Sequence, residues 1–357
     1  NNRKYISYDD AQNQKYFEHN YLGTDSIDKT KRTSIKNTIG IALQEGFNKW
    51  AKAGLTAFLS YEYRNFALTD TTNIPGQRII NNYKESSLSI GGELSKKQGK
   101  LLHYNILGEL AIAGEDAGQF SVEGRGDLNL RLFGDTVRLD VNAFIKNQNP
   151  VFYFRHFQSK HYWWDNNDLS KIMRTRLEGK LSLNRWGTQL RAGVENIKNY
   201  TYLANASIPV KDSEGNVTGF KNNAAVRQHS GNIQIFTAML QQKLKVGIFH
   251  LDGEVAYQKS SEQDILPLPE LSAYGNLYMK FGLAKKVLQI EMGADVRYFS
   301  KYYAPDYSPV IGQFYNQNPD DKIEIGAFPI VNVYANLHLK RTRFFIMMYH
   351  VNAGSGK

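Results

Sequence analysis

Charged side chains recur at every second position along several stretches of this sequence. Between Phe120 and Leu132, all the odd-numbered residues are polar and most of them are charged. Charges spaced in this way could bind ions, orient a polar solute, or pair with one another across neighbouring strands. The candidates that we select on this basis are Arg125, Arg131, Arg138, Arg174, Arg176, Lys180, Arg191, Asp252, Glu254, Glu291, Asp295 and Arg297.

The signs of these candidates differ along the chain. The candidates between Arg131 and Arg191 are all cationic, whereas those from Asp252 onward are mostly acidic. If the two groups lie on opposite walls of a water-filled space, they produce a transverse field, as in a hydrophilic pore. The alternative is that these charges pair across strands and stiffen the wall or plug it.

Residues suited to metal binding or catalysis give a weaker signal. His156 and His161 are five apart in an aromatic stretch, with Asp165 and Asp168 close behind. A zinc site needs about three or four convergent ligands, so a polar loop is the favoured interpretation. The sequence has no cysteine, no GxSxG or HExxH motif and no phosphate-binding glycine loop. We therefore predict no metal, no cofactor and no catalytic residue, with an enzyme as the less favoured alternative.

The alternation of polar and apolar residues predicts β-strands with two different faces. The even-numbered residues from Phe120 to Leu132 are apolar or glycine, and the stretches 137–146, 174–183, 251–258 and 288–298 alternate in the same way. We count about fourteen such strands, most of them about ten to sixteen residues long. Soluble strands have a typical length of about five or six residues, whereas a tilted transmembrane strand needs about nine to eleven.

The connections between these strands alternate between short and long. Examples of short turns are 97–99, 184–187 and 340–341, and the only brief connection on the opposite side is 115–118. The long connections are 66–83, 148–169, 199–230, 259–270 and 301–327. This rhythm is typical of an all-β, up-and-down transmembrane barrel, in which one rim faces the periplasm and the other faces outward.

Composition agrees with a barrel and limits the partners. The chain has 357 residues, of which 41% are hydrophobic, and no apolar run approaches the length of a transmembrane helix. Aromatic residues such as Tyr61, Trp186 and Tyr257 lie near predicted strand ends, as interfacial girdles do. The formal charge of +10 is dispersed, without a basic tail. We expect contacts with outer-membrane lipid and lipopolysaccharide, and no nucleic acid.

Two of the long connections contain hairpin signals. The stretch 150–169 is unusually aromatic, and we expect Phe152 to Phe157 to continue the strand into an external hairpin. The alternative is that these aromatic residues constrict a pore mouth. The stretch 199–230 contains Asp212-Ser213-Glu214-Gly215-Asn216, which is a good turn sequence and predicts a second external hairpin.

Several segments resemble one known family. Leu266 to Ser272 (LPLPELS), Gly293 to Asn318 and Val331 to Asn352 are similar to segments of the β-barrel porins of Bacteroidota, and Val194 to Tyr200 is similar over a shorter length. The resemblance implies an outer-membrane porin-like barrel. It brings no known substrate and no catalytic residues.

We therefore expect one outer-membrane barrel domain over 1–357. Residues 1–31 would form an outer loop or hairpin, 32–352 the barrel strands, and 353–357 the start of a further loop, so that the chain is part of a larger barrel. The favoured function is a channel in the bacterial outer membrane, through which small hydrophilic solutes pass between the pore-lining candidates. The alternative is a plugged barrel that docks partner proteins or other copies of itself. A TonB-dependent transporter is a third option, but the chain lacks a plug domain.

Overall fold

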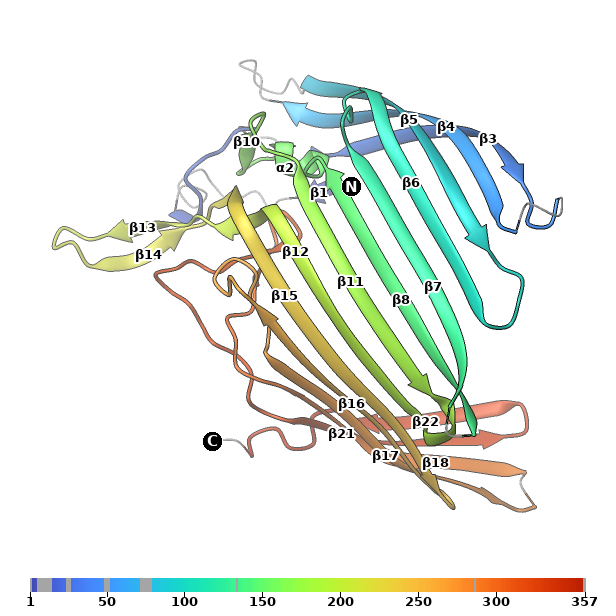
Figure 1. Ribbon diagram of the computed structural model, residues 1–357. Coiled ribbons are helices and arrows are strands. Elements are labelled where there is room, and N and C mark those ends of the chain that lie inside the picture. Colours follow the sequence, from blue (N-terminus) through green and yellow to red (C-terminus); the bar gives the residue numbers. More distant parts are fainter. Residues whose placement is uncertain are drawn as a thin grey trace.

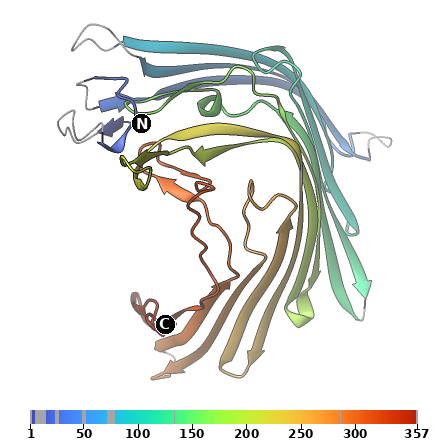
Figure 2. The same ribbon diagram turned by 90° about the vertical axis from the view of Figure 1, so that its left-hand side faces the viewer.

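The computed structural model describes residues 2–4, 15–23, 27–47, 52–70, 79–132, 134–285 and 287–355. Its main feature is one antiparallel sheet of fourteen strands, which curves around a central space (Figures 1 and 2). Each strand pairs with the strand before it and the strand after it in the order of the large sheet, so the topology is up-and-down. The prediction of an all-β sheet with about fourteen membrane-type strands is confirmed.

The strands of the large sheet differ in length from 7 to 23 residues. The longest is β15. It has more residues than a tilted strand needs to cross the hydrocarbon layer, so the end that begins at Ala224 extends beyond that layer. In chain order the strands are β3 (Lys31–Leu43), β4 (Gly54–Asp70), β5 (Ile79–Lys96), β6 (Leu102–Gly114), β7 (Phe120–Leu132), β8 (Asp135–Gln148), β11 (Ile172–Leu183), β12 (Thr188–Asn205), β15 (Ala224–Val246), β16 (Phe249–Ser260), β17 (Leu271–Leu283), β18 (Leu288–Phe299), β21 (Ile330–Leu339) and β22 (Thr342–Met348).

The two rims of the sheet carry different connections. Within the described residues, one rim has short turns, including the 3₁₀ turn η1 (Asn184–Trp186). The other, which we call the long-loop rim, carries the described long connections 149–171, 206–223, 261–270 and 300–329. The short connection 115–119 interrupts this second series, as the sequence indicates. The predicted separation of short and long connections on opposite rims is therefore present.

The long-loop rim also carries the small elements. The hairpin β13 (Ile208–Lys211) with β14 (Val217–Lys221) projects from the sheet (Figure 1), and Asp212 Oδ1 accepts hydrogen bonds from the N–H groups of Glu214 and Asn216 in its turn. The predicted hairpin within 199–230 is thus present, although β12 and β15 extend into both of its flanks. The remaining elements are α2 (Phe152–Arg155), β9 (His156–Gln158), β10 (Trp163–Asp165), β19 (Asp306–Ser308) and β20 (Gln313–Tyr315).

The ends of the chain are only partly described. Within the predicted outer hairpin 1–31, β1 (Asn2–Lys4) pairs in antiparallel register with β2 (Ile27–Lys29). Residues 5–14 and 24–26 lie outside the described residues, so the rest of that prediction is not addressed by the structure. At the other end, 349–355 forms turns after β22, and 356–357 also lie outside the described residues.

The register gives the sheet one apolar and one polar face. Leu190, Leu240 and Val255 lie opposite one another on β12, β15 and β16, and all three are exposed. The neighbouring positions Arg191, Met239 and Ala256 point to the other face, which carries most of the charges. Phe152 of α2 stacks on Phe66, which belongs to the charged face of β4. Because α2 lies on the concave side of the sheet (Figure 2), the charged face is the inner one.

The sheet is open within the described residues. The strand order begins with β22 and ends with β3, and these two strands are not paired with each other. The N–H and C=O groups along both edges need partners wherever the sheet crosses hydrocarbon, because unpaired backbone groups there cost several kcal/mol each. Further strands of a larger barrel, as predicted from the sequence, would provide these partners along both edges.

One glycine on the inner face of the sheet allows a close packing contact. The ring of Phe58 on β4 lies directly over Gly91 on β5, which is opposite it in the register. A Cβ at Gly91 would overlap that ring and lie 2.6 Å from the carbonyl oxygen of Gly108. The missing side chain therefore lets an aromatic ring cover the sheet backbone in this part of the wall.

We predict that Gly91→Ala lowers the free energy of unfolding by about 1–3 kcal/mol, because Phe58 must move to make room for the new methyl group. The matched control is Gly108→Ala on β6, where a new Cβ meets no atom within 4 Å. Urea unfolding of both variants in lipid vesicles measures the difference. Equal stability of the two variants would contradict the packing contact.

Candidate functional site

All twelve charged candidates lie on the inner face of the sheet. On β11, Arg174, Arg176 and Lys180 lie opposite Lys146, Phe144 and Asp140 of β8. On the other side of β11, Arg191 of β12 lies opposite Lys180. The same alternation continues through β15, β16, β17 and β18 and places the later acidic candidates on this face as well. We call this surface the inner wall.

The arginines of β11 are paired with carboxylates on their own and the next strand. Arg174 Nε lies 2.7 Å from Glu195 Oε1, and Arg176 Nη1 lies 4.0 Å from the second oxygen of the same carboxylate. Arg176 also pairs with Glu178, and Arg191 Nε lies 3.9 Å from Glu178 Oε1. Three arginines thus share two carboxylates, which leaves this part of the wall cationic but locally screened.

A second cluster joins β6, β7, β8 and β11. Asp127 and Asp140 lie directly opposite each other, an unfavourable arrangement for two like charges. Arg138 bridges them, at 3.7 Å from Asp127 and 2.8 Å from Asp140. Lys180 adds a contact of 3.1 Å to Asp140, and His103 Nδ1 lies 2.9 Å from Asp127. Arg138, Lys180 and His103 therefore stabilise this pair of opposed carboxylates. Alternation in the sequence does not reveal such a pair, because it does not show which residues lie opposite each other.

Two arginines of β7 are placed differently. Arg125 is exposed and lies between Asn142 on β8 and Asn105 on β6, both of which are neutral. Arg131 is also exposed and lies opposite Thr136, near the short-turn rim. These two side chains are the candidates best placed to attract anions from the central space.

The later strands carry acidic groups with mainly neutral partners. Asp252 accepts a hydrogen bond of 3.2 Å from the hydroxyl of Tyr278, and Glu254 accepts one from Gln241. Asp295 is buried; it accepts a bond of 2.9 Å from Asn332 and lies 3.8 Å from Arg297. The cationic and acidic parts of the wall are thus both present, but each contains partners of the opposite sign.

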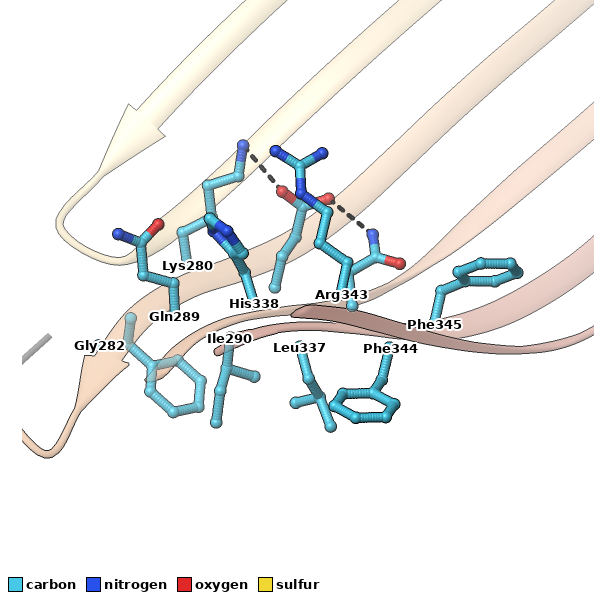
Figure 3. Close-up of a pocket in the computed structure, with 12 residues that line it drawn as sticks. Lys280, Gly282, Gln289, Ile290, Leu337, His338, Arg343, Phe344 and Phe345 are labelled. Atoms are coloured by element: carbon cyan, nitrogen blue, oxygen red, sulfur yellow. Dashed lines mark hydrogen bonds and ion pairs between the residues drawn. The ribbon is translucent and has the colours of Figure 1, made fainter. Parts of the chain in front are cut away.

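Near the short-turn rim, the two faces of the sheet can be compared side by side. Figure 3 shows Lys280, His338 and Arg343 on the inner face, and Ile290, Leu337 and Phe344 on the outer face. Lys280 Nζ lies 2.8 Å from Glu291 Oε2. Glu291, the remaining acidic candidate, is therefore paired with a cation.

The segment 149–171 folds back onto the inner wall, which the favoured interpretation of the sequence, an external hairpin, missed. Residues Phe152–Arg155 form a turn of helix, so the expected continuation of β8 through Phe157 is wrong. The ring of Phe152 stacks on Phe66 with 3.8 Å between centroids, and Gln158 Nε2 donates to the hydroxyl of Tyr83 at 2.9 Å. A short hairpin does follow, between β9 and β10. The unusual number of aromatic residues in the segment was the available signal.

The far side of this segment packs against other parts of the long-loop rim. Phe157 and Tyr162 form a buried cluster with Leu203 of β12, Ala224 of β15 and Ile311 of the connection 300–329. Burial raises the pKa of Tyr162 to about 12. Burial also lowers the pKa of His161, whose Nδ1 lies 2.9 Å from the carbonyl oxygen of His19. Both side chains are buried, so the core of the segment excludes water.

The proposed weak metal signal has an ordinary structural explanation. His156 Nδ1 lies 2.5 Å from Asp165 Oδ1, and these two residues lie opposite each other on β9 and β10. His161 is buried elsewhere in the segment, stacked on Phe17. Among the residues that the structure describes, no group of three or more His, Cys, Asp or Glu could hold a metal ion.

Residues 1–357 match the protein family described as "Putative porin". The chain belongs to this family. No curated protein sequence matches it. A porin family favours a membrane channel without enzymatic activity, in agreement with the lack of catalytic motifs in the sequence.

Solved structures show the same fold. The ferric enterobactin receptor PfeA from Pseudomonas aeruginosa is 12% identical, with a TM-score of 0.59 over 91% of this chain and 49% of the receptor. The siderophore receptor PirA from Acinetobacter baumannii is 9% identical, with a TM-score of 0.60 over 93% and 52%. The copper transporter OprC is 12% identical, with a TM-score of 0.60 over 91% and 51%. The chain spans about half the length of these proteins.

The porin-like chain is located in the bacterial outer membrane, and its fold resembles the barrels of these receptors. Its outer apolar face therefore contacts lipid. Tyr257 lies on that face near the long-loop rim, and Trp186 lies at the short-turn rim, where interfacial aromatic residues are common. In the described part of the chain, no helix is long and apolar enough to cross a membrane.

We predict that Leu240→Arg destabilises the folded protein by about 2–4 kcal/mol, because it places a charge on the lipid face opposite Val255, which lies near the middle of β16. Gln241→Arg is the matched control: its side chain points to the inner wall, where Glu254 can accept the new charge. Unfolding in vesicles compares the two variants. Similar losses would contradict the assignment of the faces.

Proposed function

We propose that the protein is a channel for passive passage of small hydrophilic solutes through a charged lumen in the outer membrane. The observation that carries this proposal is the inner wall, which carries most of the charges of the sheet and contains exposed charged residues such as Arg125 and Arg131. Hydrophilic solutes pass through wet barrels whose walls are polar in this way. The segments similar to porins of Bacteroidota support a source in that group as part of the same proposal.

The pairing of charges makes the proposed selectivity modest. Arginines such as Arg174 are held near Glu195 at short distances, and Lys180 is held near Asp140. Paired charges produce smaller fields in the lumen than isolated ones, and salt screens them over about 8–10 Å. We therefore expect a mild preference between anions and cations, set mainly by the arginines that exceed the carboxylates on β7, β8, β11 and β12.

The first test is the conductance of the full-length protein in a planar bilayer. Discrete current steps with a small shift of reversal potential in a salt gradient are expected for an open, weakly selective pore. A folded protein that never conducts would overturn the channel and leave the plugged barrel that binds partner proteins. The segment that packs across the long-loop rim is the observation that favours this second function.

We predict that the double variant Arg174→Glu with Arg176→Glu shifts the reversal potential toward cations, because it replaces two lumen cations beside Glu178 and Glu195 with two carboxylates. The control reverses Lys211 on the β13–β14 hairpin and Lys285 in a short turn, both away from the inner wall. An unchanged selectivity of the first variant, with normal conductance, would contradict the pore-lining role of these arginines.

A further inference from the structure

The connection 149–171 returns to the inner wall, and at β12 it packs beside the connection 300–329, whose Ile311 belongs to the same buried cluster. Its residues Phe157, Gln158, Ser159, Lys160, His161 and Tyr162 are all buried. In contrast, the β13–β14 hairpin projects outward and most of its residues are exposed (Figure 1). The buried part of 149–171 has no contact with lipid, so its packing surface is provided by other parts of the long-loop rim.

The segment contacts parts of the wall that lie far apart along the sheet. On one side, Phe152 stacks on Phe66 of β4 and forms an edge contact with Tyr83 of β5. On the other side, Tyr162 and Phe157 pack against Leu203 of β12. Because the sheet is curved between β4 and β12 (Figure 2), a segment that touches both ends crosses the concave space as a chord.

Arg155 fixes the segment to the wall by charge. Its Nη2 lies 2.6 Å from Glu85 Oε1, and its Nη1 lies 2.7 Å from Glu115 Oε1. Glu85 is buried and also pairs with Arg64 at 3.0 Å, and Arg64 in turn lies 2.8 Å from Asp116. Two guanidinium groups and three carboxylates therefore form one connected network between the segment, β4, β5 and the 115–119 turn. Charge-assisted bonds of this kind are strong and directional.

The short 115–119 turn leaves room for the segment to pass inward. The Glu115 carbonyl accepts a hydrogen bond of 3.1 Å from Asn149 Nδ2, at the point where the segment leaves β8. A long loop at this position would occupy the same space. The brief connection 115–119 thus lies directly beside the point where the segment turns toward the inner wall.

The N-terminal residues cover the segment from the other side. The N–H of Tyr21 donates to the carbonyl oxygen of Lys160 at 2.8 Å, and Phe17 stacks on His161 with 3.9 Å between centroids. The N–H of Lys160 lies 3.4 Å from Asp28 Oδ2. Contacts from three directions hold the segment in one position, so it is a fixed part of the mouth.

From these contacts we propose that segment 149–171 is the size-limiting constriction of the channel, and that Arg155 is the residue that positions it. The proposal rests on the channel function proposed above. Solutes that enter from the long-loop rim must pass between this segment and the uncovered part of the inner wall. The segment therefore sets the largest solute that passes, while the charged wall below it sets the preference for ion sign.

The test compares the full-length wild-type protein with Arg155→Ser in planar bilayers and in vesicles that contain sugars of increasing size. The variant removes the two ion pairs that Arg155 makes, with Glu85 and Glu115, and leaves Glu85 paired with Arg64. We expect about a twofold or larger rise in conductance and entry of larger sugars, because the narrowest cross-section controls both quantities. Arg155→Lys, which keeps one charge at this position, should give a smaller rise.

The matched control is Lys259→Ser, since Lys259 lies near the end of β16 at the same rim, opposite Phe236 on the outer face, and pairs with Glu270 at 3.6 Å. It should leave the sugar size limit unchanged. If wild type and Arg155→Ser conduct with the same size limit, the constriction is overturned while the channel function stands. If wild type is silent and the variant conducts, the segment is a complete closure and its blocking role is supported. If both are folded and silent, the channel function fails, and the constriction fails with it.

Discussion

In hydrocarbon, every backbone N–H and C=O needs a hydrogen-bonding partner within the protein, because water is absent and an unpaired group costs several kcal/mol. The architecture of this chain follows from that requirement. Fourteen strands pair in antiparallel order, with register shifts only at Leu88/Ser89 and Lys198/Tyr200 among the described pairs of this sheet. Once the backbone is paired, side chains must alternate between lipid and lumen. The exposed Leu190 and its inner neighbour Arg191 are a direct result.

The inner wall then has to accommodate many charges without a protein core around them. It does so by placing opposite charges on adjacent strands within reach of each other, as with Lys146 and Glu123, which are diagonal neighbours in the register and 2.6 Å apart. Partly exposed pairs of this kind contribute little to stability in water. Their effect is on the field in the lumen: they leave the wall hydrophilic while keeping the net charge of each region small. The residues opposite Arg125 on both neighbouring strands are neutral. Arg125 therefore affects passing ions more strongly than the arginines that are paired with carboxylates.

The sequence was sufficient to predict the parts of the structure that depend on a local period. Alternation identified the strands and the face of all twelve candidates, and turn residues such as those after Asp212 identified the hairpin. It was not sufficient to identify partners. The pairing of Arg174 with Glu195 depends on the register between two strands, and the contact of Phe152 with Phe66 joins residues far apart in the chain. No local period encodes either contact, so the inward fold of 149–171 was missed.

The location of the buried apolar clusters has the same physical origin. A soluble β-protein buries its apolar face between layers, but here that face points to lipid, and residues such as Leu177 and Leu277 are more than half exposed. The two buried clusters, around Phe66 and around Tyr162, therefore lie at the long-loop rim. Only there, above the hydrocarbon, does water make the burial of aromatic rings favourable. The segment 149–171 contributes to both clusters. The hydrophobic effect thus holds this segment across the mouth, while hydrogen bonding holds the wall beneath it.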